Sequence, residues 1–306
     1  MALTRPSLIS VDWGTSSFRA LLVDENGAVL DRAESNRGIL SVAAGEHERV
    51  LAEAVGAWRE RGAPPIVMSG MIGSRQGWVE APYAACPAGL RELAAATIEI
   101  PTEALGTVLL APGLSVLDSR GAPDVMRGEE TQIFGALARA GASEGLFVLP
   151  GTHSKWARVE AGRIVSFATY MTGELFAVLK NHSILGRGMS EGEGVGGGFE
   201  QGVDAAAHIE RPGDLLHALF MTRTLGLFDR LKPAQTADYL SGLLIGAEIA
   251  AAAREAKAAI VVASTGLTAR YRRAGARLGV TLSPAPDDCA LWGQIALRAA
   301  RKRTVA

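Results

Sequence analysis

Hydrophobic residues in the first half of the chain fall into short runs separated by small polar segments. The runs at 8–11, 18–23, 28–33, 65–68 and 108–111 have the length and the Gly, Asn or Asp boundaries of β-strands. Residues 47–61 differ, because their apolar positions lie three and four apart, which is helical spacing. This half is therefore predicted to be α/β.

The second half repeats this mixture. Strands are predicted at 145–149, 155–159, 164–169 and 260–263, and helices at 128–140, 172–185, 213–228, 235–256 and 287–301. The glycine-rich segment 186–202 is predicted to be a mobile loop.

The two halves share an order of strand, Gly-Thr-x-Ser loop, strand, turn and strand. The loops are Gly14 to Ser17 and Gly151 to Ser154. Such a duplication predicts two related domains, 1–144 and 145–306, each a mixed sheet flanked by helices, with a cleft between them.

The first loop combines groups that suit a phosphate. It holds a carboxylate at a strand end, a glycine, three hydroxyls and a cation, namely Asp12, Gly14, Thr15, Ser16, Ser17 and Arg19. Glycine lets the backbone approach phosphate oxygens, hydroxyls donate to them, and Asp12 is suited to holding Mg²⁺ directly or through water. An ordinary hairpin turn is the alternative for this segment alone.

The second loop has a similar composition and an added lysine. Its candidate phosphate-binding residues are Gly151, Thr152, His153, Ser154 and Lys155. The chain contains no Walker A motif, and no GxGxxG sequence opens one of the predicted helices.

Five segments, VDWGTSSFRALLVD, SGMIGSRQGWVEAPY, DVMRGEETQIFG, LPGTHSKW and MTGELFAVLKNHSILGR, resemble the 2-dehydro-3-deoxygalactonokinase family. These sugar-acid kinases belong to the actin/hexokinase/sugar-kinase superfamily, and the resemblance is strongest from about residue 7 to 190. It implies two actin-like, ribonuclease H-like domains with ATP·Mg²⁺ in the cleft. It also implies an adenosine region around Gly246, Thr265 and Gly266.

The acidic start of the helix at 128–140 resembles the place where related sugar kinases carry their catalytic carboxylate. Glu129 and Glu130 are both candidates, and we favour Glu129 because it directly follows Gly128. A helix N-terminus stabilises an ionised carboxylate, which suits a base. Acidic residues in a first turn are also ordinary helix design, so the residues alone leave both interpretations open.

Residues 69–78 are the predicted sugar-acid pocket. A sugar acid presents hydroxyls and a carboxylate, and Arg75 is the first candidate to bind that carboxylate. A surface loop with Trp78 packed into the core is the alternative. The candidate substrate-binding residues are Ser69, Gly70, Met71, Gly73, Ser74, Arg75 and Trp78, with Arg127 as a second cation; residues 172–174 are a candidate lining of the cleft.

Composition narrows the classes of partner and the location that are expected for this protein. The formal net charge is −1 and no long basic run occurs, so nucleic acid is not an expected partner. No apolar stretch reaches the roughly 20 residues of a membrane span, and no signal peptide is recognisable, so a cytoplasmic protein is expected. Cys86 and Cys289 lie far apart and predict free thiols. The oligomeric state is open, with a homodimer as one arrangement.

The resemblance therefore predicts an ATP-dependent kinase that phosphorylates 2-dehydro-3-deoxy-D-galactonate at its 6-hydroxyl. One rival is a kinase for another 2-keto-3-deoxy sugar acid, such as 2-keto-3-deoxygluconate. A rival of another class is a non-catalytic, actin-like nucleotide switch.

Overall fold

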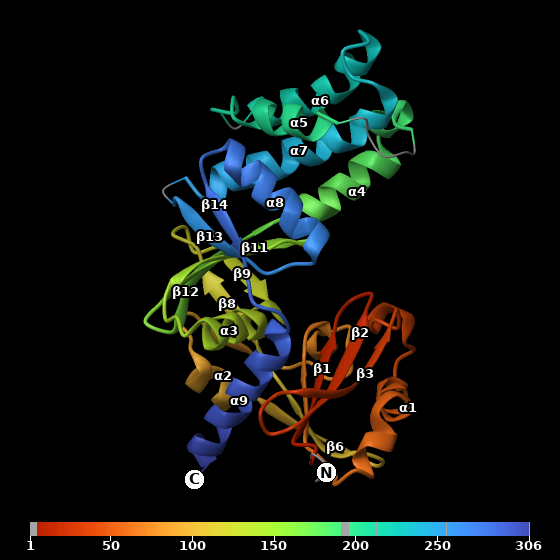
Figure 1. Ribbon diagram of the computed structural model, residues 1–306, viewed down its shortest axis with the longest axis vertical. Coiled ribbons are helices and arrows are strands. Elements are labelled where there is room, and N and C mark those ends of the chain that lie inside the picture. The colour runs from red at the N-terminus through yellow and green to blue at the C-terminus, as the bar shows by residue number, and fades with distance from the viewer. Residues whose placement is uncertain (1–4, 191–195, 212, 255, 306) are drawn as a thin grey trace. The chain divides into compact units, whose positions relative to one another are not determined.

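The structure is a computed structural model that describes residues 5–190, 196–211, 213–254 and 256–305. The chain forms two compact units (Figure 1). Unit 1 comprises Met1–Glu144, Arg158–Phe167 and Pro286–Ala306, and unit 2 comprises Gly145–Ala157 and Ala168–Ala285. The predicted ranges share the boundary at residue 144, but they placed the last helix with the second domain, whereas the structure groups it with unit 1.

Unit 1 contains a six-stranded mixed sheet in the order β3-β2-β1-β4-β7-β6. Its strands are β1 (Leu8–Trp13), β2 (Phe18–Val23), β3 (Val29–Ser35), β4 (Ile66–Ser69), β6 (Ile98–Thr102) and β7 (Gly106–Leu110). The central strands β1, β4 and β7 are parallel, and β2, β3 and β6 pair antiparallel with their neighbours.

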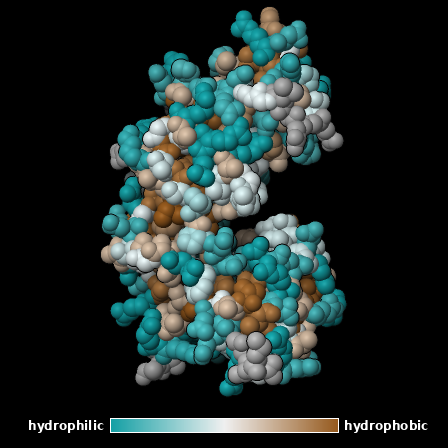
Figure 2. Space-filling model, in the orientation of Figure 1, coloured by the Kyte–Doolittle hydropathy of each residue, from teal (hydrophilic) through white to brown (hydrophobic). Residues whose placement is uncertain are grey.

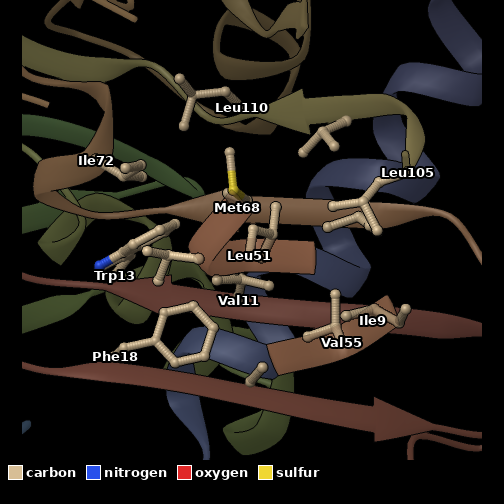
Figure 3. Close-up of a cluster of buried hydrophobic side chains, with 14 of the residues drawn as sticks. Ile9, Val11, Trp13, Phe18, Leu51, Val55, Met68, Ile72, Leu105 and Leu110 are labelled. Carbon is tan, nitrogen blue, oxygen red and sulfur yellow. The ribbon is translucent and has the colours of Figure 1, made fainter. Parts of the chain in front are cut away.

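The core of this sheet is packed against helix α1 (His47–Arg59). Figure 3 shows side chains from β1, β2 and β4 converging with Leu51 and Val55 of that helix. The apolar positions of α1 recur at helical spacing, so one face of the helix is buried. This core fixes the carboxyl ends of β1 and β4, where the candidate residues begin.

A three-stranded sheet, β5-β8-β9, was not predicted from the sequence. It consists of β5 (Tyr83–Ala85), β8 (Gly113–Leu117) and β9 (Pro123–Met126), and it leads into α3 (Glu129–Ala140). The shorter helix α2 (Leu90–Ala96) lies between β5 and β6 in the sequence.

The last helix, α9 (Cys289–Val305), packs on α3 and α2, which explains its place in unit 1. The helices α3 and α9 approach each other at two glycines. A Cβ at Gly135 would lie 1.8 Å from the carbonyl oxygen of Cys289, and a Cβ at Gly293 would lie 1.8 Å from that of Thr131. Only glycine permits this backbone contact, so α9 fixes the position of α3.

Unit 2 and the adjoining hairpin contain a five-stranded sheet in the order β12-β11-β10-β13-β14. The strands are β10 (Gly145–Leu149), β11 (Ser154–Glu160), β12 (Arg163–Tyr170), β13 (Ala258–Val261) and β14 (Thr281–Pro284). Each large sheet thus starts with its third, second and first strands in that order, followed by two parallel strands from later in the chain; the first sheet adds the antiparallel strand β6 at its edge. The duplicated mixed-sheet prediction is confirmed.

The helices of unit 2 are α4 (Thr172–His182), α5 (Gly198–Ala206), α6 (Asp214–Leu227), α7 (Pro233–Ala252) and α8 (Thr265–Arg277). Short 3₁₀ helices occur at η1 (Ile39–Ser41), η2 (Met71–Gly73) and η3 (Ile184–Gly188). The loop predicted at 186–202 was wrong from Gly198 onward, where α5 begins; residues 191–195 lie outside the described part. Hydrophilic side chains cover much of the face in Figure 2. Of the helices described, none has both the length and the apolar character to cross a membrane.

Candidate active site

Asp12 lies near the end of β1 and is paired in parallel register with Ser69 of β4. The chain then turns sharply at Gly70, whose φ is +101°. A Cβ at residue 70 would lie 2.7 Å from the carbonyl oxygen of Trp13 and 3.2 Å from Oδ1 of Asp12. Glycine is therefore required both by the backbone conformation and by the closeness of Asp12.

The start of α3 lies beside the same turn. Gly128 has a φ of +107°, and a Cβ there would lie 2.9 Å from the Cα of Gly70. Two left-handed glycines thus bring the end of β4 and the start of α3 into contact. This contact places the acidic first turn of α3 next to the strand end that carries Asp12.

Glu129 and Glu130 have different environments. Glu129 is partly exposed, and its Oε2 accepts the backbone N–H of Arg127 at 2.8 Å. Glu130 is fully buried; its Oε2 accepts the N–H of Gly128 at 2.7 Å and its Oε1 accepts the hydroxyl of Thr131 at 3.0 Å. Burial, reinforced by the charge of Glu129, raises the pKa of Glu130 to about 8. At neutral pH Glu130 is mainly protonated and enclosed, whereas Glu129 is accessible.

The pKa of Asp12 is also raised. Burial raises its pKa to about 6; Arg19 opposes this rise, the charge of Glu129 adds to it, and a hydrogen bond with Gln132 lowers it. Asp12 and Glu129 therefore repel each other, and a cation between them would relieve the repulsion.

This pair of acids fits Mg²⁺, which proteins commonly hold through one or two carboxylates while phosphates and water complete its shell. No cluster of three or more His, Cys, Asp or Glu suited to a metal occurs among the residues that the structure describes. An ion held jointly by a carboxylate and by ATP does not need such a cluster.

The first loop is accessible. Thr15, Ser16 and Ser17 are exposed, and the N–H of Gly14 donates to the carbonyl of Ser17 at 2.9 Å. The N–H of Ile39 donates to the carbonyl of Gly14, which holds the loop from the side of η1. Arg19, predicted to bind phosphate, is half exposed and pairs with Glu34 at 3.3 Å across the hairpin.

The second loop is accessible only in part. Gly151, Thr152 and His153 are exposed, and the ring of His153 pairs with Glu174 of α4. Ser154 and Lys155 already belong to β11 and are buried.

The side chains of Ser154 and Lys155 make contacts inside the protein. The Ser154 hydroxyl donates to Oε1 of Glu248 at 2.7 Å, and Nζ of Lys155 donates to the Thr169 hydroxyl at 2.7 Å. Glu248 also accepts from Trp156 and Tyr271, at 2.7 and 2.8 Å. The two residues predicted to bind phosphate are thus directed to internal partners.

A cavity of about 380 Å³ lies within unit 2 beside the second loop. Pro150 and Gly151 line its loop end, and faces of α4, α7 and α8 line the rest. Its walls combine apolar side chains, including Phe176 and Leu267, with the ion pair of Asp238 and Arg270, 2.6 Å apart. It therefore offers an apolar surface beside a hydrogen-bonding group, which is typical of a small-molecule site.

Of the predicted adenosine residues, two are exposed directly before a residue that lines this cavity, and one is buried between helices. Thr265 and Gly266 are exposed in the first turn of α8, directly before the lining residue Leu267. Gly246 is instead buried where α7 packs on α5, and a Cβ there would lie 2.7 Å from that of Ala206. Its glycine is explained by helix packing, and it does not line the cavity.

The residues of the predicted substrate loop, 69–78, also differ in exposure: some are buried in the core and others face solvent. The Ser69 hydroxyl is buried and accepts a hydrogen bond from Nε2 of Gln294 at 2.8 Å. Met71 and Gly73 belong to η2, and Trp78 packs against the core. Arg75 has an 86% exposed side chain and lies 3.4 Å from Glu80.

Arg127, the second cation considered for the substrate, is 7% exposed. Its Nη2 donates to the carbonyl of Ala81 at 2.8 Å, and its guanidinium lies 4.2 Å from the centre of the Tyr83 ring. It thus connects the residues before α3 to the substrate loop.

Sequence reasoning missed Gln132, Gln294 and the Asp238–Arg270 pair. Gln132 lies one helical turn after Glu129, so helical spacing could have identified it. Gln294 gave no local signal, because its partners Val11 and Ser69 are more than 200 residues away in the chain.

Comparison with known proteins gives consistent matches. The family described as 2-keto-3-deoxy-galactonokinase matches residues 12–297. The 2-dehydro-3-deoxygalactonokinase of Escherichia coli (strain K12) is 37% identical over 290 residues, covering 94% of this chain and 95% of that protein. DgoK1 of Rhizobium meliloti (strain 1021), named a probable 2-dehydro-3-deoxygalactonokinase, is 38% identical over 283 residues, covering 91% and 92%.

Two solved structures extend the comparison. A Sinorhizobium meliloti protein assigned as a 2-dehydro-3-deoxygalactonokinase superimposes with a TM-score of 0.86 at 38% identity, covering 97% of this chain and 99% of that one. The activator of 2-hydroxyisocaproyl-CoA dehydratase from Clostridium difficile, with bound ADPNP, gives a TM-score of 0.50 at 12% identity, covering 98% and 97%. The second likeness concerns the fold alone.

Proposed function

Because the chain belongs to the 2-keto-3-deoxy-galactonokinase family, we propose that it transfers the γ-phosphoryl group of ATP to the 6-hydroxyl of 2-dehydro-3-deoxy-D-galactonate. The observation that carries the chemistry is the meeting of Asp12 and Glu129 where β4 turns into contact with α3. Phosphoryl transfer depends on charge stabilisation and positioning, with a base oriented toward the acceptor hydroxyl.

Glu129 is the proposed base. Its carboxylate is partly exposed at a helix N-terminus, and the N–H of Arg127 holds one of its oxygens. It removes the proton from the 6-hydroxyl as that oxygen attacks the γ-phosphorus; the bond to the β,γ-bridging oxygen breaks, giving the 6-phosphate and ADP. Glu130 is a less suitable base, because its oxygens are enclosed and it is mainly protonated at neutral pH.

Asp12 is the proposed ligand of Mg²⁺, directly or through water, and the ion supplies positive charge next to the phosphates when it arrives with ATP. The exposed residues 15–17 and 151–153 are proposed to donate hydrogen bonds to phosphate oxygens. Arg19 contributes by favouring the ionised form of Asp12.

The cavity of unit 2 is the proposed adenosine site. Phe176 and Leu267 offer apolar surface for the base, and Asp238 offers carboxylate oxygens for ribose hydroxyls. Thr265 and Gly266 keep a supporting role, as the turn that leads into Leu267.

The function is tested by coupled ADP release with 2-dehydro-3-deoxy-D-galactonate and its gluconate epimer measured side by side. Turnover that depends on the sugar acid is expected, with a higher kcat/KM for the galactonate. ATP hydrolysis indifferent to either acid would favour a nucleotide switch, and a preference for the gluconate would reassign the substrate.

The base is tested by a matched pair of variants. Glu129→Gln is expected to lower kcat by about 10²- to 10⁴-fold, the usual contribution of general base catalysis, while Glu130→Gln keeps most of the turnover. The reverse ranking would transfer the role to Glu130.

We further propose that the enzyme works in the cytoplasm and pairs as a homodimer. Light scattering on the purified protein tests the second statement, because a mass near the 32.0 kDa of one chain would contradict it.

A further inference from the structure

Arg127 is a buried cation whose hydrogen-bonding capacity is largely unused. Nη2 donates to Ala81, but Nε and Nη1 have no hydrogen-bond partner among the residues that the structure describes. Nor does any described carboxylate lie within ion-pair distance of its guanidinium. A buried charge without a counter-charge destabilises a fold, so such a residue requires an explanation outside ordinary packing.

A second unpartnered group lies in the adjoining loop. Ser74 is 8% exposed, and its hydroxyl also has no partner in the described part of the chain. It follows Gly73, where a Cβ would lie 3.1 Å from Nη1 of Arg127. Among the described residues, six buried side-chain nitrogen and oxygen atoms have no hydrogen-bond partner, and three of them belong to Arg127 and Ser74.

This neighbourhood adjoins the proposed catalytic base. The backbone N–H of Arg127 donates to Oε2 of Glu129, so the cation and the base are two residues apart at the start of α3. The face of the Tyr83 ring stabilises the guanidinium and fixes its plane. A planar guanidinium with free N–H groups is suited to binding a carboxylate with two hydrogen bonds.

Arg75, the first candidate from the sequence, lacks these properties. Its side chain is 86% exposed, and it lies near Glu80. The guanidinium of Arg75 is accessible to water and lies near the carboxylate of Glu80, so an additional ion pair with a substrate carboxylate would stabilise binding only a little.

We propose that Arg127 binds the C1 carboxylate of the sugar acid, with the Ser74 hydroxyl as an additional donor, and thereby makes the kinase specific for acids. The proposal rests on the function proposed above and names the group that recognises its substrate. The 6-hydroxyl then lies toward Glu129 and the carboxylate lies toward Arg127.

The test compares the sugar acid with its C1 amide, which keeps the shape and loses the charge. The unmodified enzyme is expected to prefer the acid by about 100-fold or more in kcat/KM. Arg127→Met should lower kcat/KM for the acid by a similar factor, leave the amide within a few fold, and leave the KM for ATP unchanged. Arg75→Met is the matched control, and it should change kcat/KM for the acid less than three-fold.

Arg127→Met that slows acid and amide equally would overturn the proposal, because the residue would then only support the loop. A preference for the acid that survives the substitution would overturn it as well. If the unmodified enzyme phosphorylates no 2-keto-3-deoxy sugar acid, the proposed function itself fails, which is a different result.

Gly73→Ala provides a second variant that retains the arginine. The new methyl group would lie 3.1 Å from Nη1 and crowd the guanidinium. The KM for the acid is expected to rise several-fold with the amide unchanged. An unchanged KM for the acid, or an equal rise for both compounds, counts against the proposal.

Discussion

The two Gly-Thr-x-Ser loops have the same sequence pattern and differ in which of its side chains reach solvent. In the first, β2 begins after the motif, so Ser17 stays exposed. In the second, β11 begins at Ser154, so the serine and the following lysine are buried. Both connections are four residues long, but the second starts one residue earlier, at Pro150. A shift of one residue therefore decides which hydroxyl is available.

The carboxylates beside the two loops, Glu248 and Asp12, also differ in how well their charge is compensated by neighbouring groups. Glu248 accepts three hydrogen bonds, from Ser154, Trp156 and Tyr271, and holds the second loop in place. Asp12 is poorly compensated beside the first loop, and its pKa is raised to about 6. A satisfied carboxylate stabilises structure, whereas a poorly compensated one is available for a ligand.

The largest expected effect concerns Asp12. Asp12→Asn should lower kcat by about 10²- to 10⁴-fold, because a neutral amide oxygen holds a divalent cation beside the phosphates much more weakly than a carboxylate does. The melting temperature should stay the same or rise, since a partly buried charge that Glu129 repels is removed. Steady-state kinetics and thermal unfolding measure both; a variant that retains activity would remove Asp12 from the site.

Glu248 should behave in the opposite way. Glu248→Gln places an amide donor against groups that are themselves donors, which is expected to lower the free energy of unfolding by about 1–3 kcal/mol. Urea unfolding measures the loss. If stability were unchanged while turnover collapsed, Glu248 would be a ligand-binding residue and the contrast with Asp12 would disappear.

The corresponding serines form a matched pair. Ser154→Ala should cost about 1 kcal/mol of stability through its lost hydrogen bond, and Ser17→Ala should cost almost none because Ser17 is exposed. For the KM of ATP the order should be reversed, with a several-fold rise for Ser17→Ala. Equal effects in both assays would mean that the two loops are equivalent after all.

The smallest effect is the pH dependence of stability. The folded-state pKa of Asp12 is raised from 3.8 to about 6, so the folded protein holds a proton that the unfolded chain releases. The stability that this proton contributes is therefore present below about pH 4 and is lost as the pH rises through about 6. The full shift corresponds to about 3 kcal/mol, and the partial exposure of Asp12 lowers that value. Relative to the unmodified protein, Asp12→Asn should gain stability over that range in urea unfolding; parallel pH profiles would contradict this.

The fold was largely predictable because strand and helix periodicities are local. The β1-β2-β3 and β10-β11-β12 hairpins follow from short apolar runs with turn residues between them. The sheet β5-β8-β9 was harder to predict, because its strands are only three to five residues long. Strands β8 and β9 form a hairpin, but β5 pairs with β8 across a longer stretch of chain.

Candidate residues of the site were found where local chemistry marks them, as at Asp12 and Glu129. The inward direction of Ser154 depends on where β11 begins, and its partner Glu248 is 94 residues away. Arg75 and Arg127 are equally basic in sequence, and only burial distinguishes them. Tertiary packing therefore decides which members of a recognisable motif are available for binding.

The place of α9 in unit 1 has a consequence for synthesis of the chain. Unit 2 is encoded wholly within residues 145–285, so all of its segments leave the ribosome before the last part of unit 1. Until Gly293 and Gln294 emerge, the start of α3 lacks its glycine contact and β1 and β4 lack their hydrogen bonds from Gln294. The half of the protein that is translated first is therefore completed only after unit 2 has been translated.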